Sequence, residues 1–364
     1  MGLLRRISRA RLAGQVIRRL RRAGFADARY DARGFRVRFT TDGDETPTIL
    51  ELAPLVAARG GRRRGQVDRF VAGLVTGNRL PLEWADARPL LRPVLRGVTP
   101  GSPLRRPVLP FLYECVVVDQ PDTMTYVGSE HPAGWEVSAE QVFAAARANL
   151  SGAALHGVAS EPVVVRFVDD GDAYWTSHLL LEHWLGKLAG QVGGAPVAFA
   201  PERGTLLVTA DGSGHLRGLF ALAEEIYAAS SRPITPMAYV SDKQGCTVPY
   251  EAPPGHPLHR AVQRAERVLA VHEYTRQAAH LADQPEALTS ITGPAMAELR
   301  LVGSDERGWR TQAVWESDSP ALLPTADEVR VGEAVRPWDE VTPHLTAVPD
   351  LTPIRWAAEG WPPG

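Results

Sequence analysis

The sequence has 364 residues, of which 44% are hydrophobic and 23% charged; this excludes a chain too polar to fold and leaves room for two or three domains. Two cysteines, Cys115 and Cys246, are too few for a disulfide framework, and there is no secretory signal or apolar run of membrane-spanning length. We therefore expect a cytoplasmic protein, and its arginine-rich, lysine-poor usage is typical of a GC-rich bacterial genome.

The charge is divided unevenly along the chain. Residues 1–112 hold 23 arginines and 9 acids, a net charge of +14, whereas residues 113–364 carry −16. A split of this size indicates association with an anionic partner such as nucleic acid, an anionic membrane or an acidic protein. Docking of the basic part onto the acidic remainder of the same chain, or simple solvation, is the interpretation that we favour.

The first predicted element is a basic helix over residues 3–23. Leu4, Ile7, Ile17 and Leu20 recur at helical spacing, and arginines occupy most of the remaining surface. Such a helix is typical either of a segment lying on anionic lipid or of the first helix of a globular module. A strand pattern follows at residues 35–39 and 48–52, and this favours the globular module.

An arginine-rich loop and a proline-rich connector come next. Arg62, Arg63 and Arg64 lie between glycines and are candidates for binding a phosphate or another anion, although the loop lacks the Lys-Ser/Thr of a P-loop. An exposed basic loop without a ligand is the other interpretation. Residues 77–112 contain many prolines and are expected to form a structured connector, with room for one extended strand.

The central stretch predicts a regular alternation of strands and helices. Ser138 with Gln141 three residues later makes a capping box before a helix that ends near Leu150. The other expected elements are strands at 111–118, 163–168, 196–200, 205–209 and 234–240, and helices at 174–192, 216–229 and 257–282. A strand pair joined by the short turn at 201–204 favours antiparallel pairing.

The last segment changes in character after Asp283. Five of the nine tryptophans fall there, and the pattern of residues 299–302 and 309–315 predicts a hairpin around a polar turn. Trp309 and Trp315 are candidates for a recognition surface, with packing in a small β core as the alternative.

These elements predict an α+β fold with mixed or mainly antiparallel sheets and packed helices. We expect two α/β modules and a small β-rich appendage, divided into a basic module with its connector (residues 1–112), a central domain (residues 113–282) and the tryptophan-rich appendage (residues 283–364).

Several short motifs carry a resemblance to a known family. They are Asn149-Leu150 at a helix end, Tyr174-Trp175, the turn Pro201-Glu202-Arg203-Gly204, and Arg232-Pro233-Ile234 leading to Tyr239. With the N-terminal helix and strand pair, they make roughly residues 3–282 resemble the YtpQ-like family of bacterial proteins, whose function is unknown. The resemblance implies an α+β fold and transfers no catalytic residue.

Two groups of polar residues in the central stretch are candidate sites. His178, Glu182 and His183 share a predicted helix, but the histidines are five residues apart and do not suit one metal ion, so no metal site or cofactor is expected. Glu202 and Arg203 lie on the strand turn, where a local ion pair or a ligand-binding edge are both consistent with the sequence.

The loop from Ser241 to His259 is the candidate catalytic segment. It brings Asp242, Cys246 and His256 into one stretch, and nucleophilic catalysis needs a nucleophile, a base and an orienting group of these types. The same residues are ordinary for a turn and for a helix entry, so binding and purely structural roles stay open.

Three functions therefore remain. The first is a non-enzymatic protein–protein interaction module such as an adaptor, a chaperone-like protein or a toxin-neutralising factor. The second is a hydrolase or transferase with its site in loop 241–259. The third is binding of nucleic acid or another anionic ligand through the arginine-rich N-terminal module.

Overall fold

The protein is described by a computed structural model, and its secondary structure is α+β as expected, with several open sheets and packed helices. The described residues are 2–23, 25–32, 34–39, 48–52, 80–97, 103–120, 123–150, 158–168, 174–282, 295–315 and 319–360. In this part of the chain, every helix is too short or too polar to cross a lipid bilayer.

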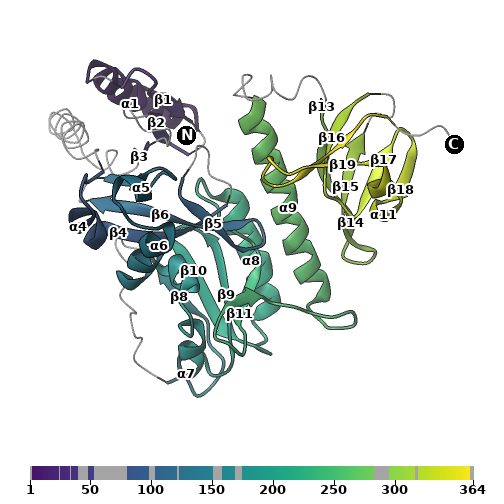
Figure 1. The fold of residues 1–364 in the computed structure, drawn as a ribbon. Coiled ribbons are helices and arrows are strands. Elements are labelled where there is room, and N and C mark those ends of the chain that lie inside the picture. The colour runs from purple at the N-terminus through teal and green to yellow at the C-terminus, as the bar shows by residue number, and fades with distance from the viewer. Residues whose placement is uncertain are drawn as a thin grey trace.

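The N-terminal module is a helix packed on a small antiparallel sheet (Figure 1). Its elements are α1 (Gly2–Arg22), β1 (Arg29–Asp31), β2 (Arg36–Phe39) and β3 (Thr48–Glu51). Leu12, Val16 and Leu20 of α1 are buried against Val37 and Phe39 of the sheet. The apolar stripe of α1 is thus used inside the module, which confirms the prediction of a first globular helix.

A second sheet is built around the long strand β6. The strands are β4 (Leu91–Arg96), β5 (Arg105–Leu109), β6 (Leu112–Gln120) and β7 (Thr123–Tyr126). β4 pairs along one edge of β6, while β5 and β7 share the other edge. The proline-rich connector therefore supplies two strands, and the division at residue 112 runs through one hydrogen-bonded sheet.

Short helices cover this second sheet. They are α4 (Trp84–Ala87), η1 (Arg88–Leu90), α5 (His131–Gly134) and α6 (Ala139–Ala148). Helix α6 begins at the predicted capping box, since Ser138 Oγ accepts from Gln141 N and Gln141 Oε1 accepts from Ser138 N. Val142 and Phe143 bury the inner face of α6 against the sheet.

The central sheet is antiparallel, in the order β12-β11-β9-β10-β8. Its strands are β8 (Val165–Val168), β9 (Pro196–Glu202), β10 (Thr205–Ala210), β11 (Ala238–Ser241) and β12 (Thr247–Pro249). The β9–β10 hairpin confirms the predicted strand pair. Every residue of β10 is buried, so both faces of the sheet are covered.

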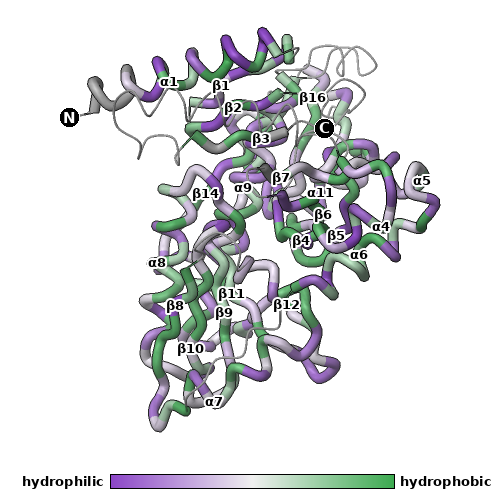
Figure 2. Tube along the Cα trace, turned by 90° about the vertical axis from the view of Figure 1, so that its left-hand side faces the viewer, coloured by the Kyte–Doolittle hydropathy of each residue, from purple (hydrophilic) through white to green (hydrophobic). Residues whose placement is uncertain are grey.

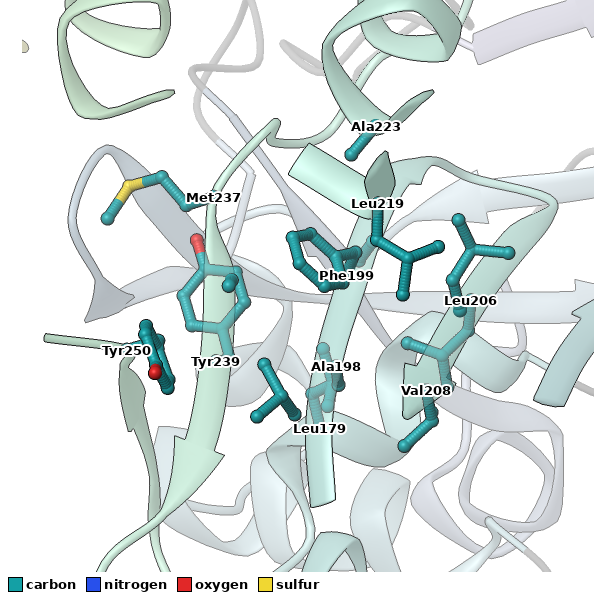
Figure 3. Packing of buried hydrophobic residues seen from close by; sticks show 14 of the residues in the cluster. Leu179, Ala198, Phe199, Leu206, Val208, Leu219, Ala223, Met237, Tyr239 and Tyr250 are labelled. Atoms are coloured by element: carbon teal, nitrogen blue, oxygen red, sulfur yellow. The ribbon is translucent and has the colours of Figure 1, made fainter. Parts of the chain in front are cut away.

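Each face of the central sheet has its own cover. Phe199 meets Phe220 of α8 (Leu216–Ala229) edge to face, and Figure 3 shows Phe199 beside Leu219 and Ala223 of that helix. Phe167 points to the opposite face and contacts Trp175 and Trp184. The sheet is therefore a layer between α8 and the segment 174–192.

That segment corrects one prediction, because it is not a single helix over 174–192. It forms η2 (Trp175–Leu180), η3 (Leu185–Leu188) and α7 (Ala189–Val192). Tyr174 and His183 have positive φ angles, 49° and 61°, which an α-helix does not allow. The N–H of His183 donates to the carbonyl of Gly245 (2.8 Å) in the β11–β12 turn, so a tertiary contact replaces helix continuation.

Helix α9 (His259–Ala282) connects the central domain to the C-terminal unit, which lies on its other side (Figure 1). Val262 and Leu269 pack in the central core, and Tyr274 packs in the core of the C-terminal unit. The helix prediction for residues 257–282 is confirmed to within two residues.

The C-terminal unit has two four-stranded sheets. One contains β14 (Glu298–Ser304), β15 (Gly308–Trp315), β17 (Glu328–Val331) and β18 (Ala334–Pro337), and the other β13 (Ala295–Met296), β16 (Ala321–Pro324), β19 (Thr346–Val348) and β20 (Arg355–Ala358). The helices α11 (Trp338–Val341) and η4 (Thr342–His344) lie between β18 and β19 in the chain. The predicted hairpin at residues 299–315 is present as β14–β15.

Candidate functional site

The loop 241–259 was the candidate catalytic segment, and its first half is a closed turn between β11 and β12. Asp242 Oδ1 accepts hydrogen bonds from the backbone N–H groups of Gln244 (3.0 Å) and Cys246 (2.8 Å). The Asp242 N–H also donates to the Cys246 carbonyl at 2.9 Å. One carboxylate oxygen of Asp242 thus holds the turn itself, as in an Asx turn.

The second half of the loop is a helix entry. His256 Nδ1 accepts from the N–H of Leu258 (3.2 Å), and His259 Nδ1 contacts the carbonyl of Ala252 (2.7 Å). Cys246 is an exposed free cysteine. Asp242 and Cys246 are joined only through backbone groups of Cys246 in the turn. Throughout this loop, which the structure describes completely, no hydrogen bond joins the Cys246 thiol to Asp242 or to His256, so the geometry supplies no nucleophile–base pair.

The histidines of segment 174–192 are separated by packing. His178 is buried between the rings of Trp175 and Trp184, with Nδ1 3.2 Å from the carbonyl of Tyr174. His183 lies instead against Gly245 of the β11–β12 turn. Among the described residues, no three His, Cys, Asp or Glu side chains are placed to hold a metal ion.

Glu202 and Arg203 leave the β9–β10 turn in different directions. Glu202 accepts hydrogen bonds from the hydroxyls of Thr205 (2.9 Å) and Ser230 (2.8 Å). Arg203 donates from Nη2 to Met124 Sδ (3.1 Å) on β7 of the second sheet. Glu202 and Arg203 therefore do not form the local ion pair that is one interpretation of the sequence.

Arg203 belongs to a polar cluster between the two sheets, which we call the Arg96–Arg203 cluster: Arg96, Asp119, Met124, Tyr126, Tyr174 and Arg203. Arg96 Nε donates to the hydroxyl of Tyr126 (3.2 Å). Burial, and then the like charge of Arg96, lower the pKa of Arg203 to about 10. Two guanidinium groups thus share a desolvated region.

Tyr174 bounds the same cluster. Its hydroxyl lies 3.9 Å from Met124 Sδ and is also hydrogen-bonded to Asp119. Burial and then the carboxylate of Asp119 raise the pKa of Tyr174, so the phenol stays protonated. Asp119 is the one carboxylate that the described structure shows in hydrogen-bond contact with this cluster.

The second basic feature is the outer face of α1. Arg11, Arg18, Arg21 and Arg22 are exposed there, and the helix has no acidic residue. Figure 2 shows hydrophilic and hydrophobic residues alternating along α1. Arg62, Arg63 and Arg64, the other predicted anion-binding residues, lie outside the described residues.

The two candidate tryptophans have different environments. Trp315 is 3% exposed, in the core of the C-terminal unit, and its indole N–H donates to the carbonyl of Ser319 (3.0 Å). Trp309 is half-buried beneath the guanidinium of Arg264 on α9, 4.1 Å from the ring centroid. Trp315 thus packs as a core residue, and Trp309 joins the C-terminal unit to α9.

Comparison with known proteins adds no assignment, because no family model, curated protein or solved structure matches the chain. The resemblance to the YtpQ-like family stays a prediction.

Sequence reasoning found Arg203 and missed Arg96, Met124, Tyr126 and Tyr174. These residues come together only because the β9–β10 turn meets the second sheet, about which local patterns carry no information. The one usable sign was that Arg203 lies on a turn of a rigid sheet, where binding residues often lie.

Proposed function

We propose that the protein is a non-enzymatic protein–protein interaction module that binds an acidic surface of a partner protein through the exposed arginines of α1. The observation that carries this proposal is the arrangement of Arg11, Arg18, Arg21 and Arg22 on the outer face of a helix without any acid. Charge complementarity of this kind steers and selects partners.

The burial of α1 argues against a membrane as the partner. A helix that lies on lipid inserts its apolar face between the headgroups. In this protein Leu12, Val16 and Leu20 are each at most 2% exposed, because they form the core of the N-terminal module. Over residues 8–22 of α1, whose side chains the structure describes, this leaves the arginine-bearing face for binding.

The charge of the rest of the chain argues against nucleic acid. Residues 113–364 carry −16, and a long polyanion bound at α1 would extend past this acidic region. A localised acidic patch on a protein meets the arginines without that repulsion.

The contacts within loop 241–259 argue against a catalytic role. The carboxylate of Asp242 and the imidazole of His256 are hydrogen-bonded to the chain's own backbone, where they stabilise a turn and a helix entry.

The experiment compares two charge-reversal variants of the full chain. In the first, Arg11, Arg18 and Arg22 become Glu; in the matched control, Arg300, Arg307 and Arg310 of the C-terminal unit become Glu, with the same change in net charge. Binding of labelled polyglutamate is measured by fluorescence anisotropy at about 50 mM salt, where electrostatic binding is strong. We expect the α1 variant to bind at least about tenfold more weakly than the wild type, and the control to bind like it.

Equal binding by the α1 variant and the control would contradict the proposal. Tighter binding of duplex DNA than of polyglutamate at the same salt would reject the protein class of partner in favour of nucleic acid. Binding to phosphatidylglycerol vesicles that matches polyglutamate would reject it in favour of an anionic membrane surface.

A further inference from the structure

The Arg96–Arg203 cluster has more positive charge than its contacts use. The guanidinium of Arg203 donates to Met124 Sδ at 3.1 Å, and a thioether is a weak acceptor. Among the residues that the structure describes, Arg203 forms no ion pair with a carboxylate. Buried charges in proteins are normally paired, so this arginine is an exception that needs an explanation.

Arg96 is in a similar situation. Its Nε donates to the Tyr126 hydroxyl (3.2 Å), and its Nη1 donates to the carbonyl of its neighbour Leu95 (2.7 Å). Its Nη2 is buried and has no hydrogen-bond partner. An unsatisfied buried donor costs about 1–3 kcal/mol, and more when the group is charged.

The surrounding elements hold these groups in place. Arg96 ends β4, Tyr126 ends β7, and Arg203 lies in the β9–β10 turn, where its N–H donates to the carbonyl of Arg232 at 3.1 Å. Arg96 and Arg203 are both of intermediate exposure as whole residues, so the cluster lies near the surface rather than at the centre of the protein. The donors of Arg96 and Tyr126 are thus placed by strand ends, and those of Arg203 by a tight turn whose backbone is hydrogen-bonded to Arg232.

We propose that Arg96 and Arg203, with the hydroxyl of Tyr126, form a binding site for a phosphate group, either free phosphate or the phosphoryl group of a small molecule. Planar guanidinium groups donate in pairs to oxyanions, and two of them balance the charge of about −1.5 to −2 that a phosphate monoester carries at neutral pH. A carboxylate, with one charge and two oxygens, would leave one arginine unmatched.

Asp119 is the carboxylate beside the proposed site. Its carboxylate is hydrogen-bonded by the Tyr174 hydroxyl, so it is directed to that phenol. The exposed Arg232 contributes a further positive charge near Arg203. The balance of the described groups is therefore positive, which is the condition for holding an anion.

The experiment titrates the full-length protein with inorganic phosphate. Isothermal titration calorimetry and the thermal midpoint are measured at constant ionic strength, with sodium acetate and sodium chloride as parallel titrants. We expect a saturable heat and a rise in the thermal midpoint with phosphate and neither with the other two salts, since a ligand that binds only the folded state stabilises it. A titration with a sugar phosphate in place of phosphate distinguishes a free anion from a phosphorylated small molecule by which binds more tightly.

Variants then locate the site. Arg203→Met and Arg96→Gln should each weaken phosphate binding about tenfold or more, and Arg203→Lys should weaken it less, because it keeps the charge but loses the paired donors. The control is Arg300→Met, which removes an exposed arginine from the C-terminal unit and should leave binding unchanged.

Three results would overturn the proposal. The first is the absence of saturable phosphate binding by the wild type, and the second is an equal response to acetate. The third is unchanged affinity in Arg96→Gln, or in Arg203→Met where that variant keeps the circular dichroism spectrum of the wild type. The wild-type titration decides the matter alone if neither variant folds.

Discussion

Arg355 and Arg203 are both arginines whose charge lies inside the protein, yet their surroundings differ completely. Burial lowers the pKa of each to about 10. Arg355, 1% exposed, donates to Gln277 Oε1 (2.6 Å) and to the carbonyls of Ala297 (3.0 Å), Leu322 (2.9 Å) and Tyr274 (3.2 Å). Among the residues that the structure describes, the Arg203 side chain has one hydrogen bond, to the sulfur of Met124.

The difference separates a structural arginine from one that is available to a ligand. Arg355 connects β20 to α9, to β16 and to Ala297 between β13 and β14, and all these contacts are neutral acceptors belonging to the protein. Arg203 spans two sheets with its donors largely unused. Burial alone therefore does not indicate the role of an arginine, whereas the number and quality of its acceptors do.

The largest expected effect comes from removing the satisfied arginine. Arg355→Met should lower the free energy of unfolding by about 4 kcal/mol, because it removes the hydrogen bonds to three buried carbonyls and to the amide oxygen of Gln277. Denaturant unfolding of the full chain, followed by circular dichroism, measures this loss.

The control for that variant is Arg300→Met, which removes an arginine from an exposed pair with Glu298. It should cost less than about 1 kcal/mol. Similar losses in the two variants would show that the Arg355 contacts contribute little.

A buried carboxylate, Glu114, allows a well-paired buried charge of the opposite sign to be compared with an exposed one. Glu114 is fully buried on β6 and accepts from Arg106 Nε (2.7 Å) and from Arg147 Nε and Nη2 (both 2.8 Å). Glu114→Gln should cost about 3 kcal/mol, since it leaves two arginines with a neutral partner.

Glu140 is the matched control for Glu114. It accepts from the same Arg106 (2.8 Å), but its side chain is 77% exposed. Glu140→Gln should change the free energy of unfolding by less than about 1 kcal/mol, and an equal loss in both variants would contradict the role given to burial.

These residues also show what could be learned from the sequence. The stripe of Leu12, Val16 and Leu20 and the capping box at Ser138 were readable because both depend on residues three or four positions apart. The break at His183 was not, because it depends on a hydrogen bond to Gly245, more than 60 residues away in the chain. Loop 241–259 suggested chemistry by its composition, and only the geometry shows that Asp242 and His256 bind the backbone.

The buried arginines were unreadable for the same reason. Nothing in the sequence around Arg355 or Arg96 marks them, since their partners come from distant strands. The hairpin pattern predicts β structure for the C-terminal appendage. It does not identify Arg355, the arginine that attaches the appendage to α9.

A smaller effect is expected at a third buried group, His272 on α9. Its Nδ1 is hydrogen-bonded to the Tyr227 hydroxyl, and burial, followed by the charge of Arg276, lowers its pKa from 6.5 to about 4. Between these pH values His272 stays neutral in the folded protein, whereas it takes up a proton in the unfolded chain. The contribution of His272 to the free energy of unfolding is therefore fully present above pH 6.5. It decreases as the pH falls toward 4, by about 1–2 kcal/mol after allowance for solvent screening.

The pH dependence of stability is tested by measuring the free energy of unfolding at pH 7.5 and at pH 5, in the wild type and in His272→Gln. The variant should lose less stability over that interval, because it has no imidazole to protonate. An identical decrease in the two proteins would assign the pH dependence to other groups.

The most direct test of the account is the sign of the effect at Arg203, where the expected change is the smallest. Arg203→Met and Arg355→Met are unfolded side by side in phosphate-free buffer. Replacing a buried, poorly paired charge by an apolar side chain is often neutral or stabilising, so we predict that Arg203→Met unfolds with the same free energy as the wild type or up to about 1 kcal/mol more, while Arg355→Met loses about 4 kcal/mol. Equal losses in the two variants would contradict the distinction between a structural arginine and one held ready for an anion.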